Sequence, residues 1–222
     1  MEEHIIKIID VSAVTHDVRR FTLEKPDGYT FTPGQATEVS VNTPELKDEK
    51  RPFTFTSLPD APHLEFTIKI YGHHDGVTNA LGKLRKGDEF IIGDAWGAIT
   101  YKGPGTFIAG GAGVTPFIAI LRYLYKENRI ANNQLFFSNK TAKDIILQEE
   151  FEKMLQDRFI NTLTREKHDK YLYGRIDKAF ITQRITDFDQ HFYVCGPDQF
   201  VKDIQNTLTA AGAHPDTVVI EE

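Results

Sequence analysis

A glycine-rich segment in the second half of the chain has the composition of a phosphate-binding turn. Residues 110–116 read Gly-Gly-Ala-Gly-Val-Thr-Pro, after one apolar run and before another with helical spacing. Thr115 is a favourable N-cap and Pro116 a favourable first helical residue, so we expect free N–H groups at the helix start, which attract phosphate. The spacing meets the fingerprint Gly-x-Gly-x-x-Gly at Gly111 and Gly113 and misses it at the third position. Taken alone, the segment is equally compatible with a turn that holds no ligand.

A second segment, residues 51–57, combines an arginine, two aromatic rings and three hydroxyl groups. A strand here would place Arg51, Phe53 and Phe55 on one face and the threonines on the other. The arginine fork suits a pyrophosphate, while a ring can cover a flat heterocycle and a hydroxyl can bond to its rim. The ordinary alternative is a barrel strand with a surface arginine.

Two further places could hold a ligand. Gly76 followed by Thr78 at the mouth of a short helix is a potential phosphate seat, although an ordinary capped helix has the same pattern. His73 and His74 in the same loop have no third ligand at a suitable spacing, so we expect solvated histidines and no metal. Cys195 ends an apolar run, and ligands bind beyond the carboxyl ends of parallel strands. A small buried hydrophobe is its ordinary alternative, since no histidine is placed to activate the thiol.

The first half of the chain, residues 1–101, predicts the domain that would carry the 51–57 segment. Six short β-rich runs alternate with turn residues, and one short helix is expected near residues 79–84. This pattern favours a closed six-stranded antiparallel β-barrel. The expected strands are residues 5–9, 18–23, 36–41, 52–56, 64–71 and 89–92.

The second half, residues 102–222, predicts an α/β domain. Apolar strands alternate with helical patterns, which indicates βαβ units and a parallel sheet with helices on both faces. Residues 102–105, Lys-Gly-Pro-Gly, are the expected connection between the two domains. The expected strands are residues 106–109, 134–138, 160–163 and 192–195, and the expected helices are residues 116–127, 147–156, 178–184 and 197–211.

The composition of the 222 residues excludes several classes of protein. The net charge of −6 leaves no basic stripe, so nucleic acid is not an expected partner. One cysteine excludes an internal disulfide, a cysteine-rich zinc site and a cysteine-ligated iron–sulfur cluster. The acidic start is unlike a signal peptide, and no segment approaches the roughly 20 apolar residues of a membrane span. We therefore expect a cytoplasmic protein.

Taken together and in this order, the segments resemble the ferredoxin–NADP reductase superfamily of flavoenzymes over nearly the whole chain. By this resemblance, Phe53 takes the place of a tyrosine packed on the isoalloxazine, Thr54 lies near the flavin N5 edge and Arg51 holds the pyrophosphate. Cys195 would lie beside the reacting nicotinamide, so it and Thr54 are the expected catalytic residues. The cofactor-binding residues that the resemblance implies are Arg51, Pro52, Phe53, Thr54, Ser57, Lys69, Ile70, Tyr71, Gly76, Val77, Thr78, Trp96, Gly111, Gly113, Val114, Thr115, Pro116, Ser138, Lys140, Arg165, Cys195, Gly196 and Pro197.

The resemblance implies an NAD(P)H-dependent flavoprotein reductase. FAD is preferred to FMN on the resemblance alone, and electrons would leave to a separate redox protein such as ferredoxin or flavodoxin. Ser138 and Lys140 follow the second strand of the α/β domain with no acidic residue before Asp144. After the third strand, Thr164 and Arg165 resemble the Ser-Arg pair of NADP-dependent relatives, so both positions favour NADPH over NADH. The alternatives are a free-flavin or ferric-chelate reductase, a non-catalytic FAD-carrying subunit of a larger complex, and a dinucleotide sensor without redox chemistry.

Two departures from the family pattern are visible. Asp94 and Ala95 replace the first residues of the short Gly-Pro-x-Gly link at the flavin. Plant-type members end in an aromatic residue that shields the flavin, whereas the last residues here, 217–222, are Thr-Val-Val-Ile-Glu-Glu. We therefore expect no aromatic cap from this tail.

Overall fold

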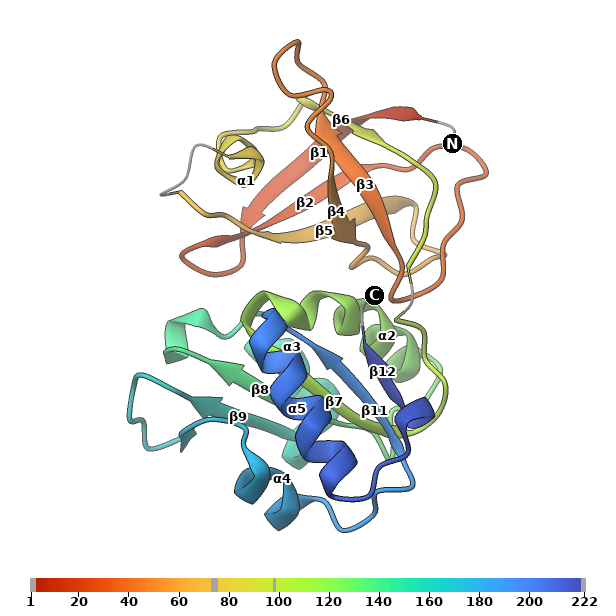
Figure 1. Ribbon diagram of the computed structural model, residues 1–222. Helices are drawn as coiled ribbons and strands as arrows, with labels where there is room; N and C mark the ends of the chain where they lie inside the picture. The colour runs from red at the N-terminus through yellow and green to blue at the C-terminus, as the bar shows by residue number, and fades with distance from the viewer. Residues whose placement is uncertain (1–2, 73–75, 98, 221–222) are drawn as a thin grey trace.

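The computed structural model describes residues 3–72, 76–97 and 99–220, and its first sheet is an antiparallel barrel (Figure 1). Six strands are hydrogen-bonded in the order β4-β3-β6-β1-β2-β5, and a bridge between Phe55 and Phe66 brings the two ends of the sheet together. The predicted six-stranded barrel is thus confirmed. Its elements are β1 (His4–Ala13), β2 (Val18–Glu24), β3 (Ala36–Val41), β4 (Arg51–Thr54), β5 (His63–Lys69), α1 (Val77–Leu81) and β6 (Glu89–Ile92).

The barrel forms because alternate residues of its strands are apolar. In β1, Ile6 and Ile8 are buried while Ile5 and Ile9 are exposed. Aromatic rings fill the interior, among them Phe21, Phe55, Phe66 and Phe90.

The second sheet is parallel throughout, as predicted for an α/β unit. Its six strands lie in the order β10-β9-β8-β7-β11-β12. The strands are β7 (Gly105–Gly110), β8 (Gln134–Asn139), β9 (Phe159–Leu163), β10 (Leu172–Tyr173), β11 (His191–Cys195) and β12 (Val218–Ile220). The helices are α2 (Thr115–Lys126), α3 (Gln148–Leu155), α4 (Lys178–Arg184) and α5 (Asp198–Ala210), with 3-10 turns η1 (Gly111–Val114), η2 (Ala142–Asp144), η3 (Gln156–Arg158) and η4 (Pro215–Thr217).

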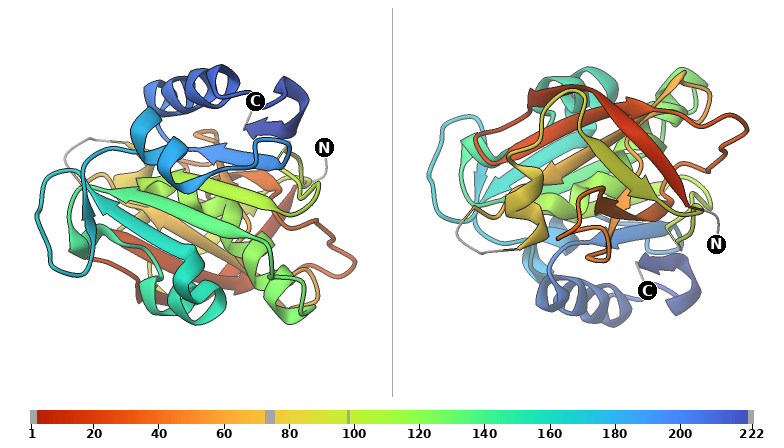
Figure 2. Two further views of the ribbon diagram at one scale, coloured as in Figure 1. Left: turned by 90° about the horizontal axis from the view of Figure 1, so that it is seen from below. Right: turned by 90° about the horizontal axis from the view of Figure 1, so that it is seen from above.

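The helices cover both faces of this sheet. One core joins alternate residues of β7 and β8 to α2 and α3, and it also includes Val18 and Ile99 from the first 101 residues. The opposite core joins Ile108, Phe136 and Val194 to α4 and α5. The views from above and below show α5 on the far side of the sheet from α3 (Figure 2). Helix α2 lies between the sheet and the barrel (Figure 1).

A buried ion network joins the two units at α2. The Arg122 guanidinium donates to the Thr56 carbonyl at 2.6 Å and to Glu65 Oε1 at 2.7 Å, both on the barrel. It also donates to both Glu150 oxygens, at 2.5 and 2.9 Å. Burial lowers the pKa of Arg122, but the hydrogen bonds that it donates to Glu150 and the charges of Glu65 and Glu150 outweigh burial, so the pKa is raised. Arg122 therefore stays charged and locks the helix to the barrel.

The connection between the units is held by a tyrosine. The Tyr193 hydroxyl accepts from the Lys102 and Gly103 amides at 2.9 and 3.0 Å and donates to the Gly103 carbonyl at 2.7 Å. The Tyr193 ring stacks on Phe107 in the core of the parallel sheet. The segment leading into β7 is thereby tied to β11.

Four local predictions differ from the structure. Thr115 is not the N-cap of α2, because helical structure already begins with the turn η1, and Thr115 Oγ1 donates to the Ala112 carbonyl. Phe55 does not share a face with Arg51: β4 ends at Thr54 and the ring turns into the barrel core. The short helix begins at Val77, two residues before its expected start. Strands β10 and β12 were not predicted. They are two and three residues long, and a segment that short cannot display a strand's alternation of apolar and polar residues.

No helix in the described part of the chain is long and apolar enough to cross a membrane. His73 and His74, expected to be solvated, lie outside the described residues.

Candidate functional site

A cleft of about 420 Å³, here called the central cleft, lies between the barrel and the parallel sheet. The barrel contributes β4, Thr67 of β5 and Tyr71, which follows β5, to this cleft. The parallel-sheet unit contributes the ends of β7 and β11 with the segments that follow them. Because a barrel strand and the glycine turn face one space, a single pair of stacked ligands can touch both. The lining residues are Pro52, Phe53, Thr54, Thr67, Tyr71, Gly110, Ala112, Gly113, Thr115, Cys195, Gly196 and Pro197.

The glycine turn packs tightly against the end of β11. A Cβ on Gly113 would lie 2.4 Å from the Cys195 carbonyl oxygen and 2.5 Å from the Gly196 nitrogen. Gly111 has a φ of +55°, a conformation that favours glycine, with open space where a side chain would project. Gly113 is thus required by the fold, while Gly111 has open space beside it and is not one of the residues that line the central cleft.

Cys195 is 7% exposed at the end of β11, where it pairs with Ala109 of β7. Its position at the carboxyl edge of the parallel sheet and in the lining of the central cleft agrees with the crevice expected from the sequence.

A second cleft, here called the Arg51 cleft, measures about 440 Å³ and brings Arg51 to the start of α1. Gly76 and Val77 line it, and Thr78 is the next residue of that helix. The Arg51 guanidinium is exposed and contacts only the Lys50 carbonyl and Glu49 in the described chain. Since Arg51 lines this cleft and Pro52 lines the central one, an elongated ligand can lie along β4 with its ring at one end and a diphosphate at the other.

A third cleft, the cationic cleft, measures about 560 Å³ and is lined from both units. It meets the central cleft at Tyr71, which lines both. Lys140 and Arg165 from the ends of β8 and β9 lie here, as does Ile70. The remaining lining residues are His16, Asp17, Arg19, Lys69, Gly72, Gly82, Thr141, Lys143 and Asp144.

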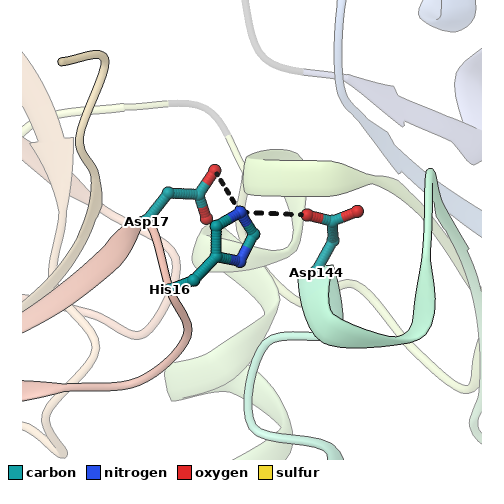
Figure 3. A group of neighbouring side chains, drawn as sticks. All are labelled: His16, Asp17 and Asp144. Carbon is teal, nitrogen blue, oxygen red and sulfur yellow. Dashed lines mark ion pairs between the residues drawn. The ribbon is translucent and has the colours of Figure 1, made fainter.

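At the rim of the cationic cleft, His16 reaches across from the barrel to the parallel sheet (Figure 3). Its Nε2 lies 3.7 Å from Asp17 Oδ2 and 3.6 Å from Asp144 Oδ1. The three ligand atoms lie within 4.8 Å of one another, a spacing compatible with a metal ion. Asp17 is already paired with Lys69 Nζ at 2.8 Å, and an ammonium ion beside that carboxylate opposes a second cation.

The Asp144 carboxylate is engaged as well. It accepts from the Thr141 amide at 2.8 Å and from the Thr141 hydroxyl at 2.6 Å, which caps the turn η2. The trio with His16 and Asp17 is therefore a contact between the two units rather than a set of uncommitted ligands.

Several expected site residues lie outside these clefts. Ser57 is buried, and its hydroxyl accepts from the Glu65 amide at 3.1 Å. Trp96 bridges to Ala36 and lines a separate small cavity of about 60 Å³. Val114 and Pro116 are buried where the turn η1 leads into α2. Ser138 lies on β8 opposite Gly110, which lines the central cleft.

Sequence reasoning did not bring together the residues from the two units that line the central and cationic clefts. Arg19 comes from β2, Thr67 and Lys69 from β5, and Lys143 from η2. Lys69 was assigned by the resemblance, but Arg19 and Lys143 look like surface cations in the sequence. No local pattern could have joined residues more than a hundred positions apart.

Two family models match this chain in consecutive segments. "Oxidoreductase FAD-binding domain" matches residues 5–101 and "Oxidoreductase NAD-binding domain" matches residues 107–206. Human NADH-cytochrome b5 reductase 1 is 29% identical over 90% of this chain and 79% of its own length. The glycine betaine monooxygenase reductase subunit of Chromohalobacter salexigens is 27% identical over 94% of this chain. The present chain spans 61% of that relative's length.

A ferredoxin NADP⁺ reductase from Neisseria gonorrhoeae, solved with bound FAD and NADP, shares the fold at a TM-score of 0.86. It is 20% identical, and the match covers 99% of this chain and 98% of that one.

The barrel, the parallel sheet and the cleft between them define a two-unit flavoprotein oxidoreductase that binds FAD and a nicotinamide dinucleotide. The chain belongs to the ferredoxin–NADP reductase superfamily. The residues present fit both cofactors, because the exposed Arg51 guanidinium and Pro52, the next residue of β4, line neighbouring clefts, and Gly110 and Gly113 of the glycine turn line the second of these.

Proposed function

We propose that this protein is a reductase that takes a hydride from NAD(P)H and passes electrons to a separate redox protein. The single observation that carries the proposal is the composition of the central cleft, whose walls are Pro52–Thr54 of the barrel and the glycine turn with Cys195. Bound FAD supplies a hydride acceptor that can release its electrons one or two at a time.

The chain's own residues would bind and orient the two cofactors. Arg51 donates in pairs to the flavin diphosphate beside the start of α1, and Phe53 and Tyr71 provide aromatic surface for a flat ring. Thr54, which is 7% exposed and lines the central cleft, offers a hydroxyl at the ring edge. The backbone of η1 faces the dinucleotide phosphates.

On the far wall, Cys195 limits how close the nicotinamide can lie. Its thiol is small and polarisable, so it packs against a ring without adding a charge. Positioning of this kind raises the rate by holding the two reacting rings in a near-attack arrangement.

The acceptor we propose is a small redox protein, with ferredoxin or flavodoxin as the first candidates. The names of the relatives add cytochrome b5 and a monooxygenase component to the candidates. One relative is named as the reductase subunit of a monooxygenase. This name supports a second candidate function for the present chain, an FAD-carrying electron-transfer subunit of a larger complex.

The test is an absorption spectrum of the purified, FAD-loaded protein with anaerobic NADPH and, separately, NADH. We expect flavin bands that bleach when nucleotide is added, because the central cleft accommodates both rings. A protein that binds FAD but is bleached by neither nucleotide would contradict the hydride step. Reduction of added ferredoxin, flavodoxin or cytochrome b5 by the same preparation then identifies the acceptor.

A further inference from the structure

The cationic cleft concentrates positive charge on an acidic protein. Five cationic side chains and two carboxylates line it, while the whole chain has a net charge of −6. A local excess of this sign in a cleft raises the concentration of anions there. The cationic residues are Arg19, Lys69, Lys140, Lys143 and Arg165.

Most of these cations have no carboxylate to neutralise them. Only Lys69 forms an ion pair, with Asp17, and the other four have no carboxylate oxygen within 4.0 Å in the described chain. The second carboxylate, Asp144, is committed to Thr141 and His16. The donors of the four cations therefore remain available to an anionic ligand.

On the barrel side of the cationic cleft, the Arg19 guanidinium has hydrogen-bond donors available for an anionic ligand. Its Nη1 lies 3.5 Å from the Thr15 and Val18 carbonyl oxygens, at the limit of a hydrogen bond. Its neighbour Arg20 is different: Nε donates to Ser12 Oγ at 3.3 Å, and Arg20 does not line the cleft. The guanidinium of Arg19 is thus turned to the cleft with most of its donors unused.

The cleft lies where the far end of a dinucleotide must be. Cys195 of the central cleft ends β11, whereas Arg165 follows β9, and β7 and β8 lie between them. Three inter-strand spacings of about 4.8 Å place these strand ends about 14 Å apart. A nicotinamide seated beside Cys195 therefore leaves the adenosine end of the same molecule at the cationic cleft.

We propose that Arg19 and Lys143 bind the phosphate on the adenosine ribose of NADPH, so that the barrel takes part in selecting NADPH over NADH. The inference rests on the proposed function and deepens it. Lys140 and Arg165 hold the same phosphate from the sheet side, and the contact of His16 with Asp144 keeps the two walls together. NADH lacks this phosphate, so it gains nothing from the cations contributed by the barrel.

The test compares two adenosine nucleotides by calorimetry on the FAD-loaded protein. Adenosine 2′,5′-bisphosphate carries the extra phosphate and adenosine 5′-monophosphate does not. We expect Arg19→Gln and Lys143→Gln each to weaken bisphosphate binding about tenfold, as for loss of one charge-assisted hydrogen bond, and to leave monophosphate binding within about twofold. Arg20→Gln is the matched control and should change neither. Arg19→Lys should recover part of the affinity.

The second measurement is anaerobic flavin reduction by NADPH and NADH in the same variants. We expect the concentration of NADPH for half-maximal rate to rise about tenfold in Arg19→Gln, with an unchanged maximal rate and an unchanged NADH response. Unchanged bisphosphate affinity in Arg19→Gln would overturn the inference, as would a loss of FAD content, which would assign the cleft to the flavin phosphates. If neither nucleotide reduces the flavin but the calorimetric difference persists, the proposed function fails and this inference stands.

Discussion

At the scale of single residues, the position of Cys195 is set by its backbone neighbours. The residue ends β11, its carbonyl lies against Gly113, and only 7% of it is exposed. A thiol held this firmly presents one surface to the central cleft. Its proposed role is to position the nicotinamide, which needs shape rather than acid–base chemistry.

We expect Cys195→Ala to slow anaerobic flavin reduction about 10- to 100-fold while FAD content stays the same, because a ring that can shift by a fraction of an ångström loses its reactive alignment. Stopped-flow absorbance at the flavin band measures the rate. Cys195→Ser keeps the size of the side chain and should be slowed less. A rate equal to that of the unaltered protein would remove the positioning role.

At the scale of elements, the turn η1 and the end of β11 approach so closely that no side chain fits between them. The Cβ that an alanine would add at Gly113 meets backbone atoms of Cys195 and Gly196, which cannot swing away as a side chain can. The turn η1 and the end of β11, both of which we propose to contact the dinucleotide, are therefore held against each other by packing.

Gly113→Ala should lower the free energy of unfolding by about 1–3 kcal/mol, the usual range for overpacking. Gly72→Ala is the control, because no atom of the described residues lies within 4 Å of its added Cβ and its φ lies outside the left-handed region. That variant should stay within about 0.5 kcal/mol. Denaturant titrations of the three proteins measure both values; equal stability of the two variants would contradict the steric argument.

At the scale of the whole molecule, Arg122 determines how the two units dock. The side chain of Arg122 is 16% exposed and that of Glu65 is 9% exposed. Removal of the arginine therefore leaves a buried carboxylate whose one remaining side-chain partner, among the described residues, is the Thr56 hydroxyl. The same helix carries Lys126, which pairs with Asp60 of the barrel, and both of these side chains are exposed.

Arg122→Met should lower the free energy of unfolding by about 3–5 kcal/mol, because a buried charge loses its partner. Replacement of Glu65 by leucine in the same protein should recover part of the loss, since two apolar residues can replace a buried pair. Lys126→Gln, four residues along α2, should have little effect because surface pairs contribute little. Thermal unfolding of the four proteins checks the order; a similar effect of Arg122→Met and Lys126→Gln would contradict the proposed lock.

Patterns among neighbouring residues explain how much of the fold could be predicted from the sequence. The alternation in β1, the apolar periodicity of α2 and the glycines at 110–113 are properties of neighbouring residues, and they were sufficient for the barrel, the parallel sheet and the turn at its carboxyl edge. The same signals failed at Phe55, because closure of the barrel onto Phe66 ended the strand two residues early. They also failed at β12, whose place beside β11 comes from pairing with a distant segment.

The sequence by itself determined the class of fold, since this depends on strand and helix periods. Short motifs and the family resemblance predicted where FAD and a dinucleotide would bind, and those places stay predictions. Only the tertiary structure decided which charges face one another. Arg19 and Lys143 line one cleft, and Arg122 contacts Glu65, because the barrel and the parallel-sheet unit dock along α2. The physical reason is that the residue type gives the sign of a charge, whereas the burial and the ion-pair partner of that charge depend on tertiary contacts between segments distant in the sequence.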